Sequence, residues 1–441
     1  MTKMLEPKSL YLQTFQNRGK ELAGKDPAWV KGLREKAMAS FEEKGFPTVE
    51  EEIWRYTDLT TSLLQVPFGF EMEFTSKTSV SARLKGMGFD VEKAHLVVFV
   101  NGRFSKEQSS IKNLPAGANL THLAELSAAD SLKPVLGQVV PSDGRPFAAL
   151  NMAYFTDGLI LQVPKGKSIP EPIHVVHLSV NASTNTQSHP RNLVVLEEDS
   201  QALLIEHYLD EAVSPYLTNS VTEVRLSRGA SLEHVKIQQE SAKAYHLGTL
   251  VAKQAEGSRF ASCTYSLGGV LARHEVETTL SEKKAECLME GLYLARGKQH
   301  VDTRTFVDHL APACKSEEVF KGVLDDEAVG IFDGRILVRE NAQKTDARQS
   351  NKNLQLSKKS QVYSKPQLQI YADDVKCSHG SATGQMDEEA LFYLQSRGIG
   401  REEARQLLVY AFAGEMLDRI PFDYLKHPLR QMVNDWMGAK P

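Results

Sequence analysis

Two residues with ligand chemistry stand close together near the end of the sequence, Cys377 and His379. They follow a long strand-rich region and precede a helical tail. In an extended chain, residues i and i+2 point to the same face, so the thiol and the imidazole can approach one spot. Sulfur and imidazole nitrogen suit iron, zinc or an iron–sulfur cluster. Because two ligands cannot hold a cluster, a metal site here needs further ligands from elsewhere in this chain or from a second chain.

The same pair also has a purely structural explanation. A Cys-x-His pair in a strand is more often a buried cysteine beside a hydrogen-bonded histidine than a pair of ligands. The other cysteines, Cys263, Cys287 and Cys314, are scattered and form no CxxC. The sequence therefore encodes no zinc ribbon, thioredoxin-like pair or ferredoxin cluster, and free thiols in a reducing compartment are expected.

The composition argues against several classes of partner. The 441 residues carry 52 Lys and Arg against 56 Asp and Glu, a net charge of −4. This near balance gives no electrostatic basis for binding nucleic acid or an anionic membrane. Apolar runs such as 407–413 are too short to span a bilayer, and residues 1–7 lack a signal-peptide core. We therefore expect a soluble, cytoplasmic protein.

The hydrophobic periodicity changes twice along the chain. Residues 9–23 and 27–45 have apolar side chains at helical spacing. From about His95, and almost without interruption from Gly158, short β-branched segments follow one another with small turn clusters between them. Helical patterns return from Asp387, a good N-cap, with a first helix expected to end at Gly398 and further helices over 401–420 and 423–436. These changes predict an N-terminal helical domain (1–90), a strand-rich core (91–380) and a C-terminal helical domain (381–441).

The strand-rich core has a weak repeat of about 28 residues. An apolar column recurs at that offset: Val176, Leu204, Leu232, Phe260 and Leu288. It breaks near Ser316. Short strands with a solenoid-like period favour a mainly β fold with a parallel β-helix of about four or five turns over an ordinary antiparallel domain. The open ends of such a stack need capping, and the helical regions lie on both sides of it.

Recognisable catalytic motifs are missing from the sequence. There is no Walker A loop, no GxGxxG opening a helix, no HExxH and no GxSxG. Six histidines fall on separate segments without metal-ligand spacing, and we interpret them as core or surface residues: His207, His234, His246, His274, His300 and His309. The chain alone is therefore not expected to be an enzyme.

Several segments resemble one known family. Residues 371–400, YADDVKCSHGSATGQMDEEALFYLQSRGIG, are similar to the C-terminal signature of SufD, in the SufB/SufD family of SUF iron–sulfur cluster assembly scaffolds. Segments 52–57, 330–335, 345–347 and 349–351 also resemble this family, and the likeness extends over most of the chain. SufB members are usually longer and lack the Lys-Cys-Ser-His-Gly signature, so the resemblance favours SufD. The order of small residues over 381–383 departs from the family pattern.

The resemblance implies a right-handed parallel β-helix core flanked by N-terminal and C-terminal helical domains. It also implies a complex with a SufB-like scaffold subunit and two copies of a SufC-like ATPase. In the family, the histidine that matches His379 works with a SufB cysteine at the interface where a transient iron–sulfur cluster is built, and Cys377 matches a neighbouring cysteine. His379 and Cys377 are therefore the expected cluster and metal ligands of a non-catalytic scaffold.

The C-terminal helices have two expected uses. An apolar face over 401–420 usually buries against its own domain, whereas the resemblance implies that these helices dock the ATPase. ATP-linked dimerisation of that ATPase is then expected to strain the β-helices and expose Cys377 and His379.

Two alternatives describe a stand-alone β-helix protein. One is a carbohydrate-active enzyme, a class that is commonly secreted and needs a carboxylate or basic cluster in a groove. The other is a purely structural subunit in which His379 is packed and inert. An exposed β-helix edge would also allow the chain to pair with a second copy of itself as a homodimer.

Overall fold

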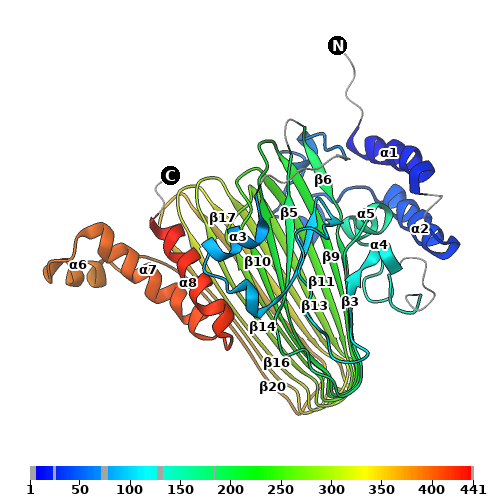
Figure 1. Cartoon of the computed structure of the whole chain (residues 1–441). Helices are drawn as coiled ribbons and strands as arrows, with labels where there is room; N and C mark the ends of the chain where they lie inside the picture. The colour runs from blue at the N-terminus through cyan, green and yellow to red at the C-terminus, as the bar shows by residue number, and fades with distance from the viewer. Residues whose placement is uncertain (1–5, 23–25, 71–77, 127–132, 182–183, 439–441) are drawn as a thin grey trace.

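The centre of the molecule is a β-solenoid of about 8 turns, with helices at both ends of the chain (Figure 1). The computed structural model describes residues 6–22, 26–70, 78–126, 133–181 and 184–438. Two stacks of strands form the walls, and we name them the β20 sheet and the β19 sheet after their last strands. This arrangement confirms the expected fold class, a mainly β solenoid between helical regions.

Neighbouring strands in each sheet come from successive coils and are parallel, except for β1–β2 and β3–β4. The β20 sheet contains, in spatial order, β2 (Arg103–Phe104), β1 (His95–Val100), β5 (Ile173–Ser179), β8 (Gln201–Asp210), β10 (Ser231–Gln238), β12 (Arg259–Ser266), β14 (Glu286–Ala295), β16 (Lys315–Leu324), β18 (Asp346–Gln355) and β20 (Lys376–Gln385). The β19 sheet contains β19 (Gln361–Ile370), β17 (Val329–Val338), β15 (His300–His309), β13 (Leu271–Leu280), β11 (Ala244–Gln254), β9 (Tyr216–Leu226), β7 (Arg191–Leu196), β4 (Leu159–Val163) and β3 (Asn119–His122), and β6 (Thr186–Ser188) pairs with β9.

The coils differ in length, so a fixed repeat of 28 residues drifts out of register. The first residues of β8, β10, β12 and β14 pair in succession at offsets of 30, 28 and 27 residues. Leu232 and Phe260 pair as predicted, but the predicted column is wrong on both sides of them. On its other side, Leu232 pairs with Ala202 rather than with Leu204. Phe260 pairs on its other side with Cys287 rather than with Leu288. The stack also continues through Ser316 to β20 instead of breaking there.

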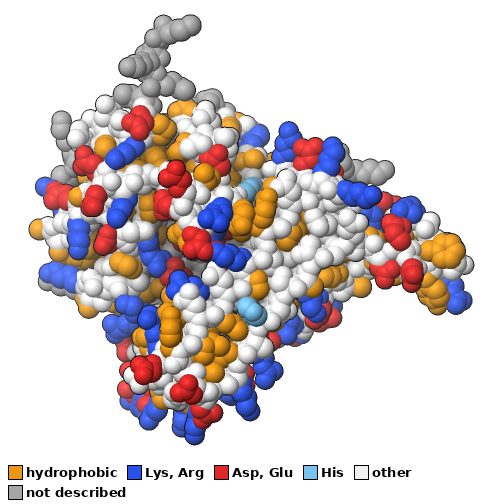
Figure 2. Space-filling view, turned by 180° about the vertical axis from the view of Figure 1, so that it is seen from behind, with side chains coloured by type: hydrophobic (Ala, Val, Ile, Leu, Met, Phe, Trp, Pro, Cys, Tyr) orange, Lys and Arg blue, Asp and Glu red, His pale blue; other side chains and the backbone are white. Residues whose placement is uncertain are grey.

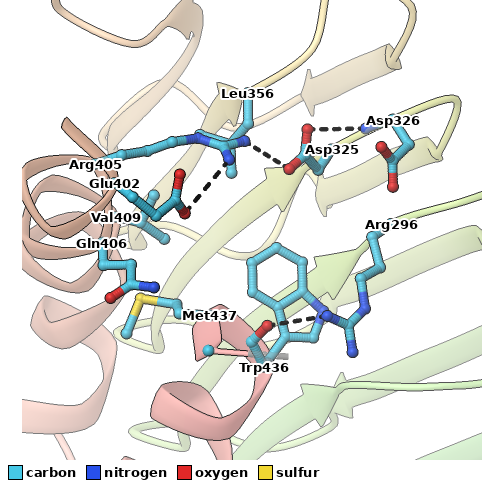
Figure 3. Close-up of a pocket in the computed structure, with 11 residues that line it drawn as sticks. Arg296, Asp325, Asp326, Leu356, Glu402, Arg405, Gln406, Val409, Trp436 and Met437 are labelled. Atoms are coloured by element: carbon cyan, nitrogen blue, oxygen red, sulfur yellow. Dashed lines mark hydrogen bonds and ion pairs between the residues drawn. The ribbon is translucent and has the colours of Figure 1, made fainter. Parts of the chain in front are cut away.

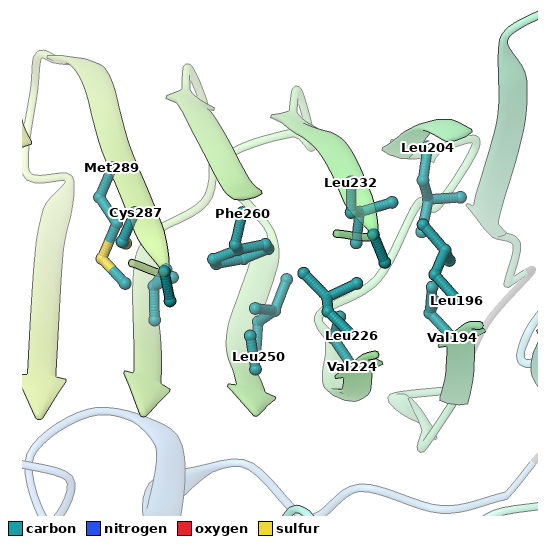
Figure 4. Close-up of a cluster of buried hydrophobic side chains, with 14 of the residues drawn as sticks. Val194, Leu196, Leu204, Val224, Leu226, Leu232, Leu250, Phe260, Cys287 and Met289 are labelled. Carbon is teal, nitrogen blue, oxygen red and sulfur yellow. The ribbon is translucent and has the colours of Figure 1, made fainter. Parts of the chain in front are cut away.

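Apolar side chains that point between the two sheets form the main hydrophobic core (Figure 4). Val194 and Val224 of the β19 sheet oppose Leu204, Leu232 and Phe260 of the β20 sheet, and all five are buried. Each such side chain contributes roughly 1.5–3 kcal/mol when it is removed from water. The core therefore joins the two sheets coil by coil along the stack.

A polar cluster is also buried inside the solenoid, which the apolar repeat did not predict. Glu206 accepts hydrogen bonds from Tyr208 Oη at 2.6 Å and from Thr222 Oγ1 at 2.7 Å. Lys236 Nζ lies 3.1 Å from His274 Nδ1, and burial lowers the pKa of this lysine to about 8. Five of the six histidines considered above are buried, which confirms the core interpretation for them: His207, His234, His246, His274 and His309.

Most of the N-terminal helices cover one end of the solenoid, whereas the third of them lies on the outside of the β20 sheet (Figure 1). They are α1 (Pro7–Leu22), α2 (Ala28–Lys44), α3 (Val80–Gly86), α4 (Leu123–Leu126) and α5 (Pro146–Tyr154), with short 3₁₀ turns η1 (Glu52–Trp54), η2 (Leu63–Gln65) and η3 (Val91–Lys93). The two helices predicted over 9–23 and 27–45 are present as α1 and α2, and Ala23 lies outside the described residues. Tyr11, Phe41 and Tyr154 pack α1, α2 and α5 into one hydrophobic cluster.

Three helices follow the last strand, as predicted: α6 (Glu388–Ser396), α7 (Arg401–Asp418) and α8 (Asp423–Gly438). Asp387 caps α6 by accepting hydrogen bonds from the backbone of Glu389 and Ala390. α7 and α8 pack on the outside of the β20 sheet, whereas α6 projects from the body (Figure 1). Within the described ranges, every helix is too short or too polar to cross a bilayer.

Candidate functional site at the open end of the solenoid

The solenoid ends in two strands that are each paired on one side. In the part of the chain that the structure describes, β20 pairs with β18 and β19 pairs with β17, and no strand pairs with their outer edges. Both strands are 10 residues long. Their free N–H and C=O groups can therefore accept a further strand from another chain.

Both predicted ligands lie on β20, at this open end. Cys377 pairs with the buried Ala347 and packs partly buried against the core inside the solenoid. Burial raises the pKa of its thiol above the usual value, so the group is a protonated thiol at neutral pH until a metal or a cation displaces the proton. His379 pairs with the buried Gln349, and its own side chain is exposed. The alternation of strand side chains directs both groups toward the same face.

The two edge strands are largely uncharged. Lys365 and Lys376 are their only charged side chains. Ile370, the last residue of β19, is 40% exposed, and Tyr371, in the turn that follows it, is 65% exposed. Figure 2 shows a face whose middle is mostly uncharged, with apolar patches and histidines, while acidic and basic side chains gather around it. Uncharged free strand edges beside exposed apolar groups are typical of a surface that another protein covers.

The described part of the chain supplies no complete metal site. No group of three or more His, Cys, Asp or Glu side chains in it is arranged to hold a metal ion. Cys263, Cys287 and Cys314 belong to other coils and are buried or half-buried. Because iron–sulfur clusters need about four ligands, Cys377 and His379 can form only part of a cluster site.

Two residues beneath His379 were missed as functional candidates. Gln349 and Glu318 lie in the same register line one and two strands below it, and both side chains are buried. In the sequence, Gln349 belongs to the segment 349–351 that resembles the family, and this resemblance implies no role for its side chain. A polar residue at an inward position between apolar ones is the signal that could have found them, but the uneven coil lengths hide which positions point inward.

The N-terminal segment 52–57 supports the other edge strand. Thr57 Oγ1 donates a 2.6 Å hydrogen bond to the buried Asp302, and Trp54 stacks on the Arg273 guanidinium at 3.6 Å. Tyr56 stacks on Tyr363 of β19, with ring centroids 4.3 Å apart. The segment therefore ties β13, β15 and β19 together on the outside of the solenoid.

A cavity of about 360 Å³ lies away from these residues, between α7, α8 and the turns of the solenoid (Figure 3). Its charged groups already have partners, since Arg405 pairs with Asp325 at 2.6 Å and with Glu402 at 3.9 Å. Arg296 donates to the Trp436 carbonyl at 3.1 Å. The cavity marks the joint between the helices and the solenoid, whereas the ligand chemistry lies on an open strand edge.

Two family models match the chain over most of its length. The SufBD core domain of the SUF system for FeS cluster assembly matches residues 178–412, and the SufBD protein N-terminal region matches residues 5–175.

Individual relatives agree with these models. An iron–sulfur cluster assembly SufBD family protein of Synechocystis is 34% identical, over 88% of this chain and 87% of that protein. The iron–sulfur cluster assembly protein SufD of Escherichia coli is 30% identical over 87% of both chains, and SufD of Bacillus subtilis is 25% identical over 96% of both. These matches establish that the chain belongs to the SufBD family of iron–sulfur cluster assembly proteins.

Proposed function

We propose that this chain is a non-catalytic, SufD-type scaffold subunit that helps to assemble iron–sulfur clusters at an interface with a SufB-like subunit in the cytoplasm. The observation that carries the proposal is the position of Cys377 and His379 on an unpaired edge strand. A thiol and an imidazole there can meet ligands of a second chain. The cluster is then the cargo of the complex, shared across the interface and released from it.

The open end of the solenoid is suited to the scaffold partner. A second solenoid that adds its own edge strands to β19 and β20 would satisfy their free backbone groups and cover Ile370 and Tyr371. The partner would supply the thiolates that an iron–sulfur site prefers. Pairing with a second copy of this chain would bring two Cys377 and two His379 side chains, which is two thiolates fewer than most clusters have.

The C-terminal helices are suited to an ATPase partner. Phe392 and Tyr393 of α6 are 71% and 58% exposed, and Leu407 of α7 is 46% exposed. The other side of α7 is fixed to the solenoid, because Met416 and Leu417 are buried against it. The predicted apolar face over 401–420 is thus mostly used inside the molecule, and α6 supplies most of the free apolar surface.

α7 connects the proposed ATPase-binding surface to the open end of the solenoid, so movement of the ATPase can reach the proposed cluster site. α7 contacts β14 and β16, and these strands lead through β18 to β20. Movement of the ATPase subunits on ATP binding would pull on α7 and strain the last coils. That strain would open the interface and expose Cys377 and His379 to incoming iron and sulfide.

An anaerobic affinity purification of the tagged chain from its native extract, followed by mass spectrometry, tests the partners. Recovery of a SufB-like subunit and a SufC-like ATPase, with iron and sulfide in the complex, is the expected result. A chain that is recovered alone or as a homodimer would contradict the proposed assembly role.

Substitutions in the same complex test the ligands. We expect His379→Ala and Cys377→Ser to reduce the iron and sulfide bound per complex without loss of either partner. His427→Ala, at an exposed histidine of α8, and Cys263→Ser are the matched controls. Normal cluster content in His379→Ala would instead identify the chain as a purely structural subunit.

A further inference from the structure

A buried amide lies directly beneath His379. Glu318 of β16, Gln349 of β18 and His379 of β20 pair in one register line. Glu318 and Gln349 are 0% and 3% exposed. Neighbouring parallel strands are about 5 Å apart, and paired side chains point to the same face. The three side chains therefore form a column that leads from the inside of the solenoid to its open end.

Gln349 is held in place from two sides. Its Nε2 donates a hydrogen bond to Glu318 Oε2. On the opposite sheet, a Cβ at Gly334 would collide with Gln349 Nε2 and would lie 2.9 Å from Thr305 Oγ1. Only a glycine leaves room for the amide at this point. The side chain of Gln349 is thus fixed with its nitrogen directed at the strand below.

The oxygen of this amide is unused. Gln349 Oε1 is buried and has no hydrogen-bond partner among the described residues. A buried acceptor without a donor costs roughly 1–3 kcal/mol, so a donor that arrives on assembly would be favoured. The amide of Gln349 is planar and its Nε2 is directed at Glu318. Gln349 Oε1 can therefore accept a hydrogen bond from the next strand, β20. The residue at that position is His379, whose ring N–H is a donor.

We propose that Gln349, held by Glu318, is a positioning residue for His379. When a partner subunit covers the open end, Gln349 Oε1 accepts the imidazole N–H of His379. This bond fixes the ring and its tautomer, and it leaves the lone pair of the other ring nitrogen for a ferrous ion or for the iron of a nascent cluster. The inference rests on the proposed function, because only there is His379 a ligand.

The test is an anaerobic titration of the purified complex with Co²⁺, whose absorption spectrum reports its ligands. We expect Gln349→Leu to weaken Co²⁺ binding by about 10–100-fold and to give the spectrum of His379→Ala. The double variant Glu318→Gln/Gln349→Glu reverses the amide–carboxyl pair and keeps an acceptor oxygen beneath the imidazole. It should therefore bind Co²⁺ within about threefold of the wild-type complex.

A control separates positioning from general stability. Gln254 is another buried glutamine inside the solenoid, where it accepts from Thr278 Oγ1 at 2.9 Å. Gln254→Leu should lower thermal stability but leave the Co²⁺ affinity and spectrum unchanged. If Gln349→Leu does not fold, the double variant Glu318→Gln/Gln349→Glu provides the test. Failure of the folded double variant to bind Co²⁺ would overturn the inference.

The possible failures are distinguishable. A Gln349→Leu complex that binds Co²⁺ with wild-type affinity and a His379-dependent spectrum overturns the role of Gln349 and leaves the proposed function standing. A His379→Ala complex that is indistinguishable from wild type in both readouts overturns the ligand role of His379 and, with it, this inference.

Discussion

At the scale of single residues, a buried carboxyl makes stability depend on pH. Burial raises the pKa of Glu318 to about 7, from 4.5. The folded chain therefore holds this proton more tightly than the unfolded chain, so the contribution to stability is full below pH 4.5 and is lost as pH rises through 7. We expect Glu318→Gln to be about 3 kcal/mol more stable than wild type at about pH 8 and nearly equal at about pH 4.5, as measured by urea unfolding.

The neighbouring residue provides the control for this prediction. Glu317 precedes Glu318 on β16, but its side chain is 47% exposed and pairs with Arg419 at 2.8 Å. Glu317→Gln should therefore leave the pH dependence of unfolding close to that of wild type, since exposed ion pairs contribute little. An identical pH slope in Glu318→Gln and wild type would show that the carboxyl is not buried as described.

A buried histidine gives the opposite pH dependence. His177 stacks between Phe99 and Tyr208, with ring centroids 5.3 and 4.8 Å away, and neither ring nitrogen has a partner among the described residues. Burial lowers the pKa of this histidine to about 4, so its contribution is full above pH 6.5 and is lost as pH falls toward 4.

We expect that replacing His177 with an uncharged ring of similar shape removes this loss of stability in acid. His177→Phe keeps the stacking and removes two buried nitrogens, and it should be the more stable protein, with the larger gain below about pH 6. The melting temperature measured between about pH 5 and 8 checks this prediction. A wild-type melting temperature that falls no faster with acid than that of His177→Phe would contradict it.

The sequence alone could reveal the two predicted ligands but not the two residues beneath His379. Cys377 and His379 could be placed on one strand face because their spacing of two residues is local. Glu318 and Gln349 lie 61 and 30 residues before His379, and they approach it only through the register of three strands. The role that we propose for them depends on the stacking order of the coils, which local sequence does not determine.

At the scale of elements, α7 is joined to the solenoid by a buried lysine. Lys321 of β16 is 4% exposed and donates to the Phe412 carbonyl of α7 at 3.0 Å, and it also pairs with Glu415. A hydrogen bond from a charged donor in such a place contributes about 1.5–3 kcal/mol. We expect Lys321→Met to speed amide hydrogen exchange in α7 by roughly tenfold or more, while the solenoid strands exchange as before.

The matched control lies on the next strand. Lys352 of β18 pairs in register with Lys321, but its side chain is exposed. Lys352→Met removes the same charge without breaking a buried contact, so exchange in α7 should be unchanged. Equal protection of α7 in wild type and Lys321→Met would show that the apolar packing of Met416 and Leu417 alone holds the helix.

The elements themselves were predicted unequally well. The terminal helices follow from local signals, such as the Asp387 cap and the 3.6-residue spacing over 401–420, and these signals do not depend on other coils. The run of short strands predicted the solenoid correctly, but the strand register predicted from the 28-residue repeat was only partly correct. Turns of unequal length shift each coil by up to a few residues, and buried polar groups such as Lys236 interrupt the apolar column.

At the scale of the whole molecule, the two ends of the solenoid differ. The N-terminal end is closed by the antiparallel strands β2 and β3 and by packed helices, whereas β19 and β20 leave the other end open. The exposed aromatic residues of α6 lie on a separate projection (Figure 1). The open end and α6 are therefore two separate surfaces, and the partner that we propose for each can be tested one at a time.

This separation predicts opposite losses in two variants. Ser378→Lys places a charge on the outer face of β20, beside the edge to which a strand would be added. Lysines on edge strands disfavour strand addition, so the tagged chain should lose the scaffold partner and keep the ATPase. Phe392→Ser/Tyr393→Ser removes the apolar surface of α6 and should have the reverse effect. Val213→Ser, at a valine that is 57% exposed on another loop, should retain both partners in the same anaerobic purification. Loss of both partners in either variant would mean that the two surfaces are one interface, and the strain that we propose α7 to transmit to His379 would then have no separate source.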